Sequence, residues 1–147
     1  MLAAIRPEAW NFPLLLHVLA AMTLVGAVGA GVVAELAAAR ADEPAFLRRL
    51  AFRIFLLGAL PAYIVMRVGA EWLRSKELSG SSADPTWLAI GRGVADGGGL
   101  ALLISMILAG VASRRSSSGL SKAAGVLAAI TLVGWLVAIW AMGAKPA

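Results

Sequence analysis

Four long apolar stretches constrain the fold of this 147-residue chain more than any other feature of its sequence. They run over residues 12–36, 52–73, 87–112 and 120–142. A helix rises about 1.5 Å per residue, so about twenty apolar residues cross the hydrocarbon core of a bilayer, and each stretch is that long. Within lipid, backbone polar groups must be bonded inside their own segment, which favours helices over open strands. The sequence predicts an all-α integral membrane protein, an up-down-up-down four-helix bundle, as a single transmembrane domain over 1–147.

The composition agrees with lipid as the main solvent of the chain. Hydrophobic residues make up 61% of the sequence and charged residues only 14%, and the mean hydropathy is +0.86. A soluble domain of this length could not bury so much apolar surface in one core. The net charge of +5 comes largely from Lys and Arg beside the apolar stretches, where lipid headgroups and membrane orientation explain them. The expected partner is therefore the lipid bilayer and not nucleic acid.

The distribution of Lys and Arg predicts the orientation of the chain. The connections after the first and third stretches contain Arg40, Arg48, Arg49, Arg53, Arg114, Arg115 and Lys122. The opposite side has Arg6, Arg74, Lys76 and Lys145. Basic residues are enriched on the cytoplasmic side, so we expect both termini outside a bacterial cytoplasmic membrane. Near that same outer boundary, where indole rings prefer the headgroup layer, lie Trp10, Trp72, Trp87 and Trp140.

Glycines recur in the first and third stretches and allow close helix packing. They are Gly26, Gly29, Gly31, Gly91, Gly93, Gly97, Gly98 and Gly99. Small residues four positions apart, such as Gly93 and Gly97, let two membrane helices approach closely. Two interpretations follow: packing inside the monomer, or an interface in a homo-oligomer or a larger membrane complex, of which the chain would be an accessory subunit.

Two similar segments place charged residues inside the second and third stretches. Arg67 and Glu71 are four residues apart on one helical face, as are Arg92 and Asp96. Both pairs fall in the predicted outer leaflet. Because a charged group inside a span costs about 2.5 to 3.5 kcal/mol on insertion scales, the four side chains are expected to form a network across the two helices.

His17, the only histidine, shares the depth of these pairs. It lies about 8 Å below the outer boundary by helical rise. The hydroxyl of Tyr63 is expected to reach toward the same region, and Pro61 is expected to distort the second helix.

Two interpretations of this polar region stay open. In the first, the charges form a salt-bridge network that fixes helix register. In the second, His17, Arg67, Arg92 and Asp96 line an outer-leaflet cavity beside the glycines at 97–99. Such a cavity would bind an anionic or strongly polar group, such as a lipid headgroup, a quinone carbonyl or a haem propionate. No catalytic motif is present and the chain has no cysteine, so binding is expected in preference to catalysis.

A family resemblance adds a further expectation. The segment Leu14-Leu-Leu-His17-Val-Leu-Ala, followed by a glycine-rich half-span, resembles the opening of bacterial membrane proteins of the DUF2269 and copper-resistance-D-like group. The blocks that begin at Pro61, Asp96 and Trp140 are similar to uncharacterised actinobacterial four-span integral membrane proteins. The first resemblance implies a helical bundle that uses a first-span histidine for copper or haem b. Only His17 matches that pattern, so a methionine or His17 of a second subunit would have to complete the site.

Overall fold

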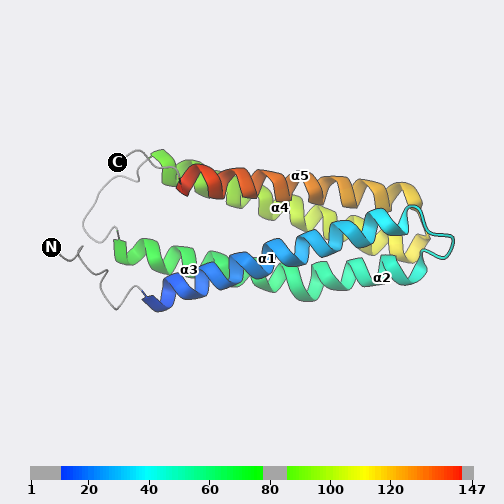
Figure 1. Cartoon of the computed structure of the whole chain (residues 1–147), viewed down its shortest axis with the longest axis horizontal. Helices are drawn as coiled ribbons and strands as arrows, with labels where there is room; N and C mark the ends of the chain where they lie inside the picture. The colour runs from blue at the N-terminus through cyan, green and yellow to red at the C-terminus, as the bar shows by residue number, and fades with distance from the viewer. Residues whose placement is uncertain (1–10, 78–85, 144–147) are drawn as a thin grey trace.

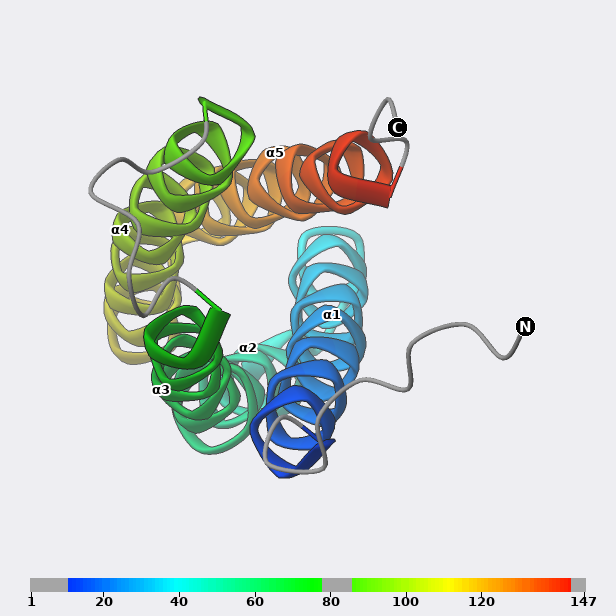
Figure 2. The same ribbon diagram turned by 90° about the vertical axis from the view of Figure 1, so that its left-hand side faces the viewer.

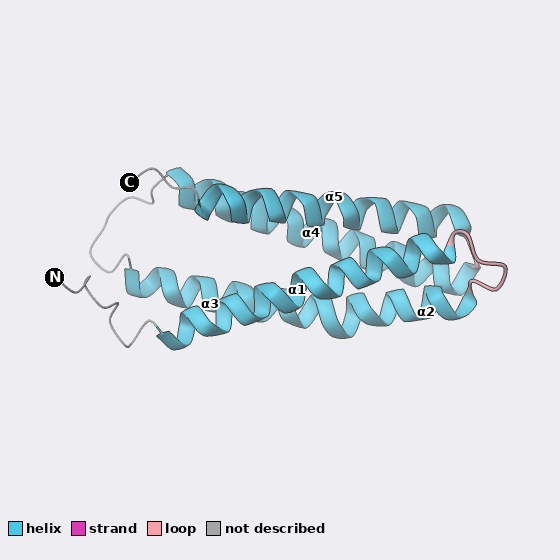
Figure 3. Ribbon diagram, in the orientation of Figure 1, coloured by secondary structure: helices cyan, strands magenta, loops and turns pink. Residues whose placement is uncertain are grey.

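A computed structural model of the chain describes residues 11–77 and 86–143. These residues form helices joined by short connections (Figure 3). The elements are α1 (Asn11–Ala38), α2 (Ala45–Ile54), the π-helical turn η2 (Phe55–Ala59), α3 (Leu60–Glu77), α4 (Thr86–Arg115) and α5 (Ser118–Gly143). Arg6, Trp10 and Lys145, which entered the orientation argument, lie outside the described residues.

Four helices are long and apolar enough to cross a membrane, which confirms the predicted fold class. They are Asn11–Ala38, Ala45–Lys76, Ala89–Arg115 and Ser118–Trp140. Successive helices run in opposite directions along the long axis of the molecule (Figure 1). The start of α1 and the end of α5 lie at one end, called the terminal end below. The connections 39–44 and 116–117 lie at the other end, called the loop end. The chain is an integral membrane protein with the form of a four-helix bundle.

The second span starts seven residues earlier than the apolar stretch suggested. Helix α2 begins at Ala45 and continues without a break through η2 into α3. Arg48, Arg49 and Arg53, which were expected in a loop, therefore lie on the helix. The prediction failed because it judged helix length from hydropathy. Backbone hydrogen bonding lets a helix extend beyond its apolar part when one of its faces packs and the other is exposed.

The π-helical turn accommodates a large side chain that is fully buried in the core. Phe55 is fully buried, and its ring lies against α1 at Gly31, where an added Cβ would come within 2.7 Å of Phe55 Cζ. The turn ends two residues before Pro61, which lacks an N–H and cannot continue the regular hydrogen-bond ladder. The helical distortion expected at Pro61 is thus found in the turn just before it.

Small residues dominate the core, so the helices approach one another closely. The buried cluster comprises Leu24, Val28, Phe55, Ala59, Ala62, Leu102, Ala109, Ala124, Ala128 and Trp135. Viewed from the terminal end, the helices follow one another around the bundle (Figure 2). Helix α1 packs along α3 and α5, and α4 packs along α5, whereas α3 and α4 make few contacts. The pair α1 and α3 diverges from α4 and α5 toward the terminal end (Figure 1). At the terminal end, the contacts that join α3 to α4 are largely polar.

Candidate functional site

Five charged side chains converge between α3 and α4 at the terminal end, and we call them the charge network. The shortest contact crosses between the helices: Arg67 Nη2 lies 2.7 Å from Asp96 Oδ1, within charge-assisted hydrogen-bond range. Glu71 lies 3.7 Å from each of three arginines, Arg67, Arg74 and Arg92. These longer contacts are ion pairs beyond hydrogen-bond length. The network thus contains the four expected residues together with Arg74.

The network is partly open. The side chain of Arg67 is 21% exposed, whereas that of Asp96 is 58% exposed. Because a charged group in a span is costly unless compensated, the cross-helix pairing stabilises the charges at this depth. Three guanidinium groups gathered at a partly open surface favour the approach of an anion.

His17 lies beside this network and is held by α3. Its Nδ1–H donates a hydrogen bond to the carbonyl oxygen of Met66, 3.0 Å away and one residue before Arg67. The helices are close here because Gly69 has no side chain: an added Cβ would lie 3.0 Å from the backbone nitrogen of His17. The backbone carbonyl can only accept, so it fixes the tautomer with the proton on Nδ1 and leaves Nε2 with its lone pair.

Two rings fill the space expected beside the glycines of α4. The Tyr63 hydroxyl donates to the carbonyl of Ala95, 3.2 Å away, and its ring stacks on Trp135 with the centroids 6.3 Å apart. A Cβ at Gly98 would lie 2.6 Å from Trp135 Cε2, and one at Gly99 would overlap the Tyr63 ring. Aromatic side chains from α3 and α5 therefore fill the space that the two glycines leave toward the core, although Gly98 also lines a groove between α4 and α5.

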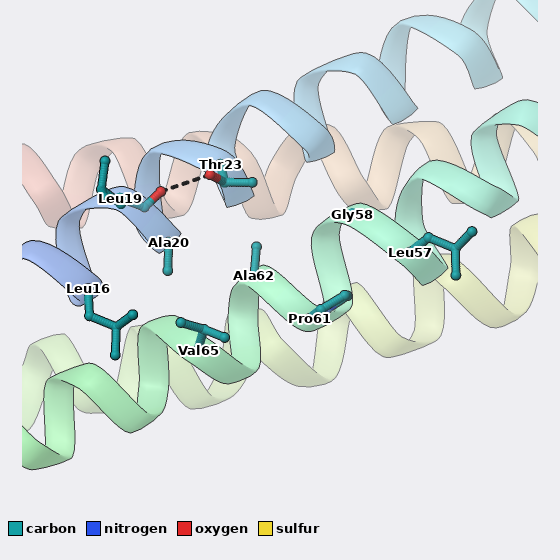
Figure 4. A pocket seen from close by; sticks show the side chains of 9 residues that line it. All are labelled: Leu16, Leu19, Ala20, Thr23, Leu57, Gly58, Pro61, Ala62 and Val65. Carbon is teal, nitrogen blue, oxygen red and sulfur yellow. Dashed lines mark hydrogen bonds between the residues drawn. The ribbon is translucent and has the colours of Figure 1, made fainter.

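Two surface grooves are apolar and lie away from the charge network. One, of about 350 Å³, runs between α1 and the second span (Figure 4). Its lining is Leu16, Leu19, Ala20, Thr23, Leu57, Gly58, Pro61, Ala62 and Val65. Thr23 presents no free hydroxyl proton, since it donates to the carbonyl of Leu19 at 2.9 Å. The other, of about 300 Å³, lies between α4 and α5 and includes Gly97 and Trp135. Both grooves suit hydrocarbon chains.

Sequence reasoning missed a second polar group, which lies at the loop end. Glu35 from α1, Arg48 from α2 and Ser121 from α5 come together there, and we call them the loop-end cluster. Glu35 and Ser121 are fully buried and Arg48 is 4% exposed. The Ser121 hydroxyl donates to Glu35 Oε2. A carboxylate inside an apolar stretch was the signal that could have drawn attention to Glu35. The sequence did not link Glu35 to its partners, because they lie on other helices and Arg48 was assigned to a loop.

The described residues bring no three His, Asp or Glu side chains together as a metal-binding group. Comparisons with models of protein families, with curated proteins and with solved structures give no match to the chain. The argument for function therefore rests on the charge network and its surroundings.

Proposed function

We propose that this membrane protein binds an anionic or strongly polar group at the charge network and catalyses no reaction there. The observation that carries the proposal is the convergence of three guanidinium groups, those of Arg67, Arg74 and Arg92, at a partly open site between two helices that otherwise make few contacts.

The ligand chemistry follows from the guanidinium groups and their depth. Arg67 lies five residues before Trp72, about 7.5 Å along the helix, so the group it holds is drawn below the headgroup level that Trp72 favours. Guanidinium groups bind phosphate and carboxylate through paired hydrogen bonds. Such bonds strengthen where water is scarce. A phospholipid phosphate, a haem propionate or a quinone carbonyl fits these donors. The two anions fit better than the neutral carbonyl because each carries a full negative charge, and of the two the phosphate is supplied by the bilayer itself.

The proposed orientation places the network in the outer leaflet of the bacterial cytoplasmic membrane. Arg40, Arg49, Arg114 and Arg115 are exposed at the loop end, and this concentration of basic residues favours the cytoplasmic side. Trp72 is 42% exposed and Trp140 is 73% exposed, both near the terminal end, where indole rings suit the headgroup layer.

Lipid retention tests this proposal. The protein is purified from nanodiscs that contain equal amounts of phosphatidylglycerol and phosphatidylcholine, and the bound lipid is measured by native mass spectrometry. We expect preferential retention of phosphatidylglycerol, and loss of that preference when Arg74→Gln is combined with Arg92→Gln. The matched control combines Arg114→Gln with Arg115→Gln, which removes the same charge from exposed positions at the loop end.

A parallel titration with inorganic phosphate in detergent distinguishes the two sources of the anion. Phosphate binding that the Arg74 and Arg92 changes abolish identifies a free anion as the ligand, whereas retention of lipid alone identifies a headgroup. Equal retention of both lipids by the native protein, together with no phosphate binding, would contradict the proposal.

Haem at His17 is the second candidate function. The observation that favours it is the hydrogen bond from Nδ1–H to the Met66 carbonyl, because histidines that coordinate iron through Nε2 are commonly oriented in this way. The structure does not supply a second axial histidine, since His17 is the only one in the sequence. Copper at His17 would require a methionine or a second subunit to complete its donors, because the described residues bring no three His, Asp or Glu side chains together. An absorbance spectrum with a Soret band that His17→Ala removes would support haem, and metal analysis would test copper.

A subunit interface is the third candidate. Gly93 and Gly97 are exposed on α4, and a Cβ at either position would meet nothing within 4 Å. Their spacing suits the close approach of a further helix, from a second copy or from a larger complex. Co-purification in mild detergent that Gly97→Leu disrupts would support this role.

A further inference from the structure

The loop-end cluster encloses two polar atoms that have no hydrogen-bond partner. Glu35 Oε2 accepts a bond from Ser121, but Glu35 Oε1 has no partner, and neither has Arg48 Nε. Glu35 is 0% exposed and Arg48 is 4% exposed, so neither headgroups nor bulk water reach these atoms in this arrangement. Leaving a buried donor or acceptor unsatisfied is costly, and more so for a charged group. Two such atoms in one cluster therefore point to a site that binds a small polar molecule.

The two charged side chains attract each other without touching. The positive charge of Arg48 acts on the Glu35 carboxyl. Within the described ranges, however, the direct ion pairs belong to the charge network at the other end, and none joins Glu35 to Arg48. A buried donor and a buried acceptor in one cluster that make no direct bond to each other are commonly bridged by a molecule that bonds to both.

Charge and space restrict what that molecule can be. Arg48 disfavours a cation and Glu35 disfavours an anion, so the occupant is neutral and both donates and accepts hydrogen bonds. It is also small, because α1 and α5 are tightly packed beside the carboxyl. A Cβ added at Gly125 would lie 3.1 Å from Glu35 Cβ and 3.4 Å from Leu36 Cδ2. Water is the molecule that meets these conditions.

We infer that the loop-end cluster is a buried water-binding site. The water donates a hydrogen bond to Glu35 Oε1 and accepts one from Arg48 Nε, and Ser121 completes the coordination of the carboxyl. The site joins α1, α2 and α5, and it places an internal water beside a carboxyl within the membrane-spanning part of the chain. This inference is independent of the function proposed for the charge network.

Radiolytic footprinting of the native protein tests the inference directly. A brief X-ray pulse converts bound water into hydroxyl radicals, which oxidise side chains within a few ångströms, and mass spectrometry locates the oxidised residues. We expect oxidation of Leu36 although its surroundings are tightly packed. The internal control is Leu108, three residues after Ser105 on α4, because it is partly buried like Leu36. Ser105 is as fully buried as Ser121, but its hydroxyl donates to the Ala101 carbonyl of its own helix at 2.8 Å and so requires no water. Oxidation of Leu36 no greater than that of Leu108 would overturn the inference.

A paired substitution then tests which atoms hold the water. Combining Glu35→Met with Arg48→Met replaces both charged groups by apolar side chains of similar length, and we expect the Leu36 oxidation to be lost. The matched control, Ser105→Ala, should leave it unchanged. If the oxidation persists in a folded double variant, these two residues do not hold the water and the assignment is wrong. Should the double variant fail to fold, the comparison of Leu36 with Leu108 in the native protein still decides whether the water is present.

Discussion

Replacement of Gly31 by alanine should loosen the junction between α1 and the second span. Gly31 is buried and faces the ring of Phe55, which is itself fully buried in the π-helical turn. The new Cβ would overlap Phe55 Cε1 and lie 2.7 Å from Phe55 Cζ. Ordinary van der Waals contact begins near 3.4 Å, so the ring or one helix would have to retreat by more than 0.7 Å. In a close-packed core such a displacement disturbs the neighbouring contacts.

The expected cost follows from overpacking. An extra carbon that forces side chains and backbone to shift typically costs about 1–3 kcal/mol. Alanine also favours helix over glycine, by about 1 kcal/mol in water. Gly26→Ala, five residues earlier on α1, isolates that second effect because nothing lies within 4 Å of its added Cβ. Gly31→Ala should therefore be less stable than Gly26→Ala by about 1–3 kcal/mol.

Unfolding of the purified protein by added sodium dodecyl sulfate in mixed micelles measures this difference. The fluorescence of Trp135, which is buried in the core, should report the loss of packing. Combining Gly31→Ala with Phe55→Leu should recover part of the loss, because the smaller side chain vacates the position that the Cβ requires. Equal stability of Gly31→Ala and Gly26→Ala, or strictly additive effects in the double variant, would refute the steric argument.

Three further predictions follow from the same structure. Gly99→Ala should destabilise the bundle by about 1–3 kcal/mol in the same unfolding assay, because its Cβ would displace the Tyr63 ring, and stability equal to the native protein would contradict this. The losses in unfolding free energy caused by Arg67→Gln and Asp96→Asn should be less than additive. The expected coupling energy is about 0.5–1 kcal/mol, because the Asp96 side chain is more than half exposed. A coupling energy of zero in a double-mutant cycle would argue against the cross-helix pair. A single cysteine introduced as Asp42→Cys should react with an impermeant thiol reagent only after the cells are permeabilised, whereas labelling of intact cells would reverse the proposed orientation.

The sequence predicted which residues form the charge network, but it did not predict which of them pair most closely. Arg67, Glu71, Arg92 and Asp96 were placed at one depth because helical rise converts residue number directly into depth. That reasoning could not predict which ion pair is the shortest. Arg67 pairs most closely with Asp96 on the next helix, and its intrahelical neighbour Glu71 is 1.0 Å farther away, at 3.7 Å against 2.7 Å. Which of two carboxylates an arginine reaches depends on how the helices are rotated, and spacing along one helix does not contain that rotation.

The sequence by itself determined the properties of single segments, whereas only the tertiary structure decided how the helices face one another. Hydropathy and length are properties of each segment by itself, so four spans and their alternating directions could be read from the sequence. The face that each helix turns inward is a property of pairs of helices. In lipid both the inside and the outside of a bundle are apolar, so the sequence shows little contrast between the two faces. For this reason only the structure revealed that Gly31 and Gly99 accommodate rings while Gly93 and Gly97 remain open, and that Glu35 meets Ser121, 86 residues away.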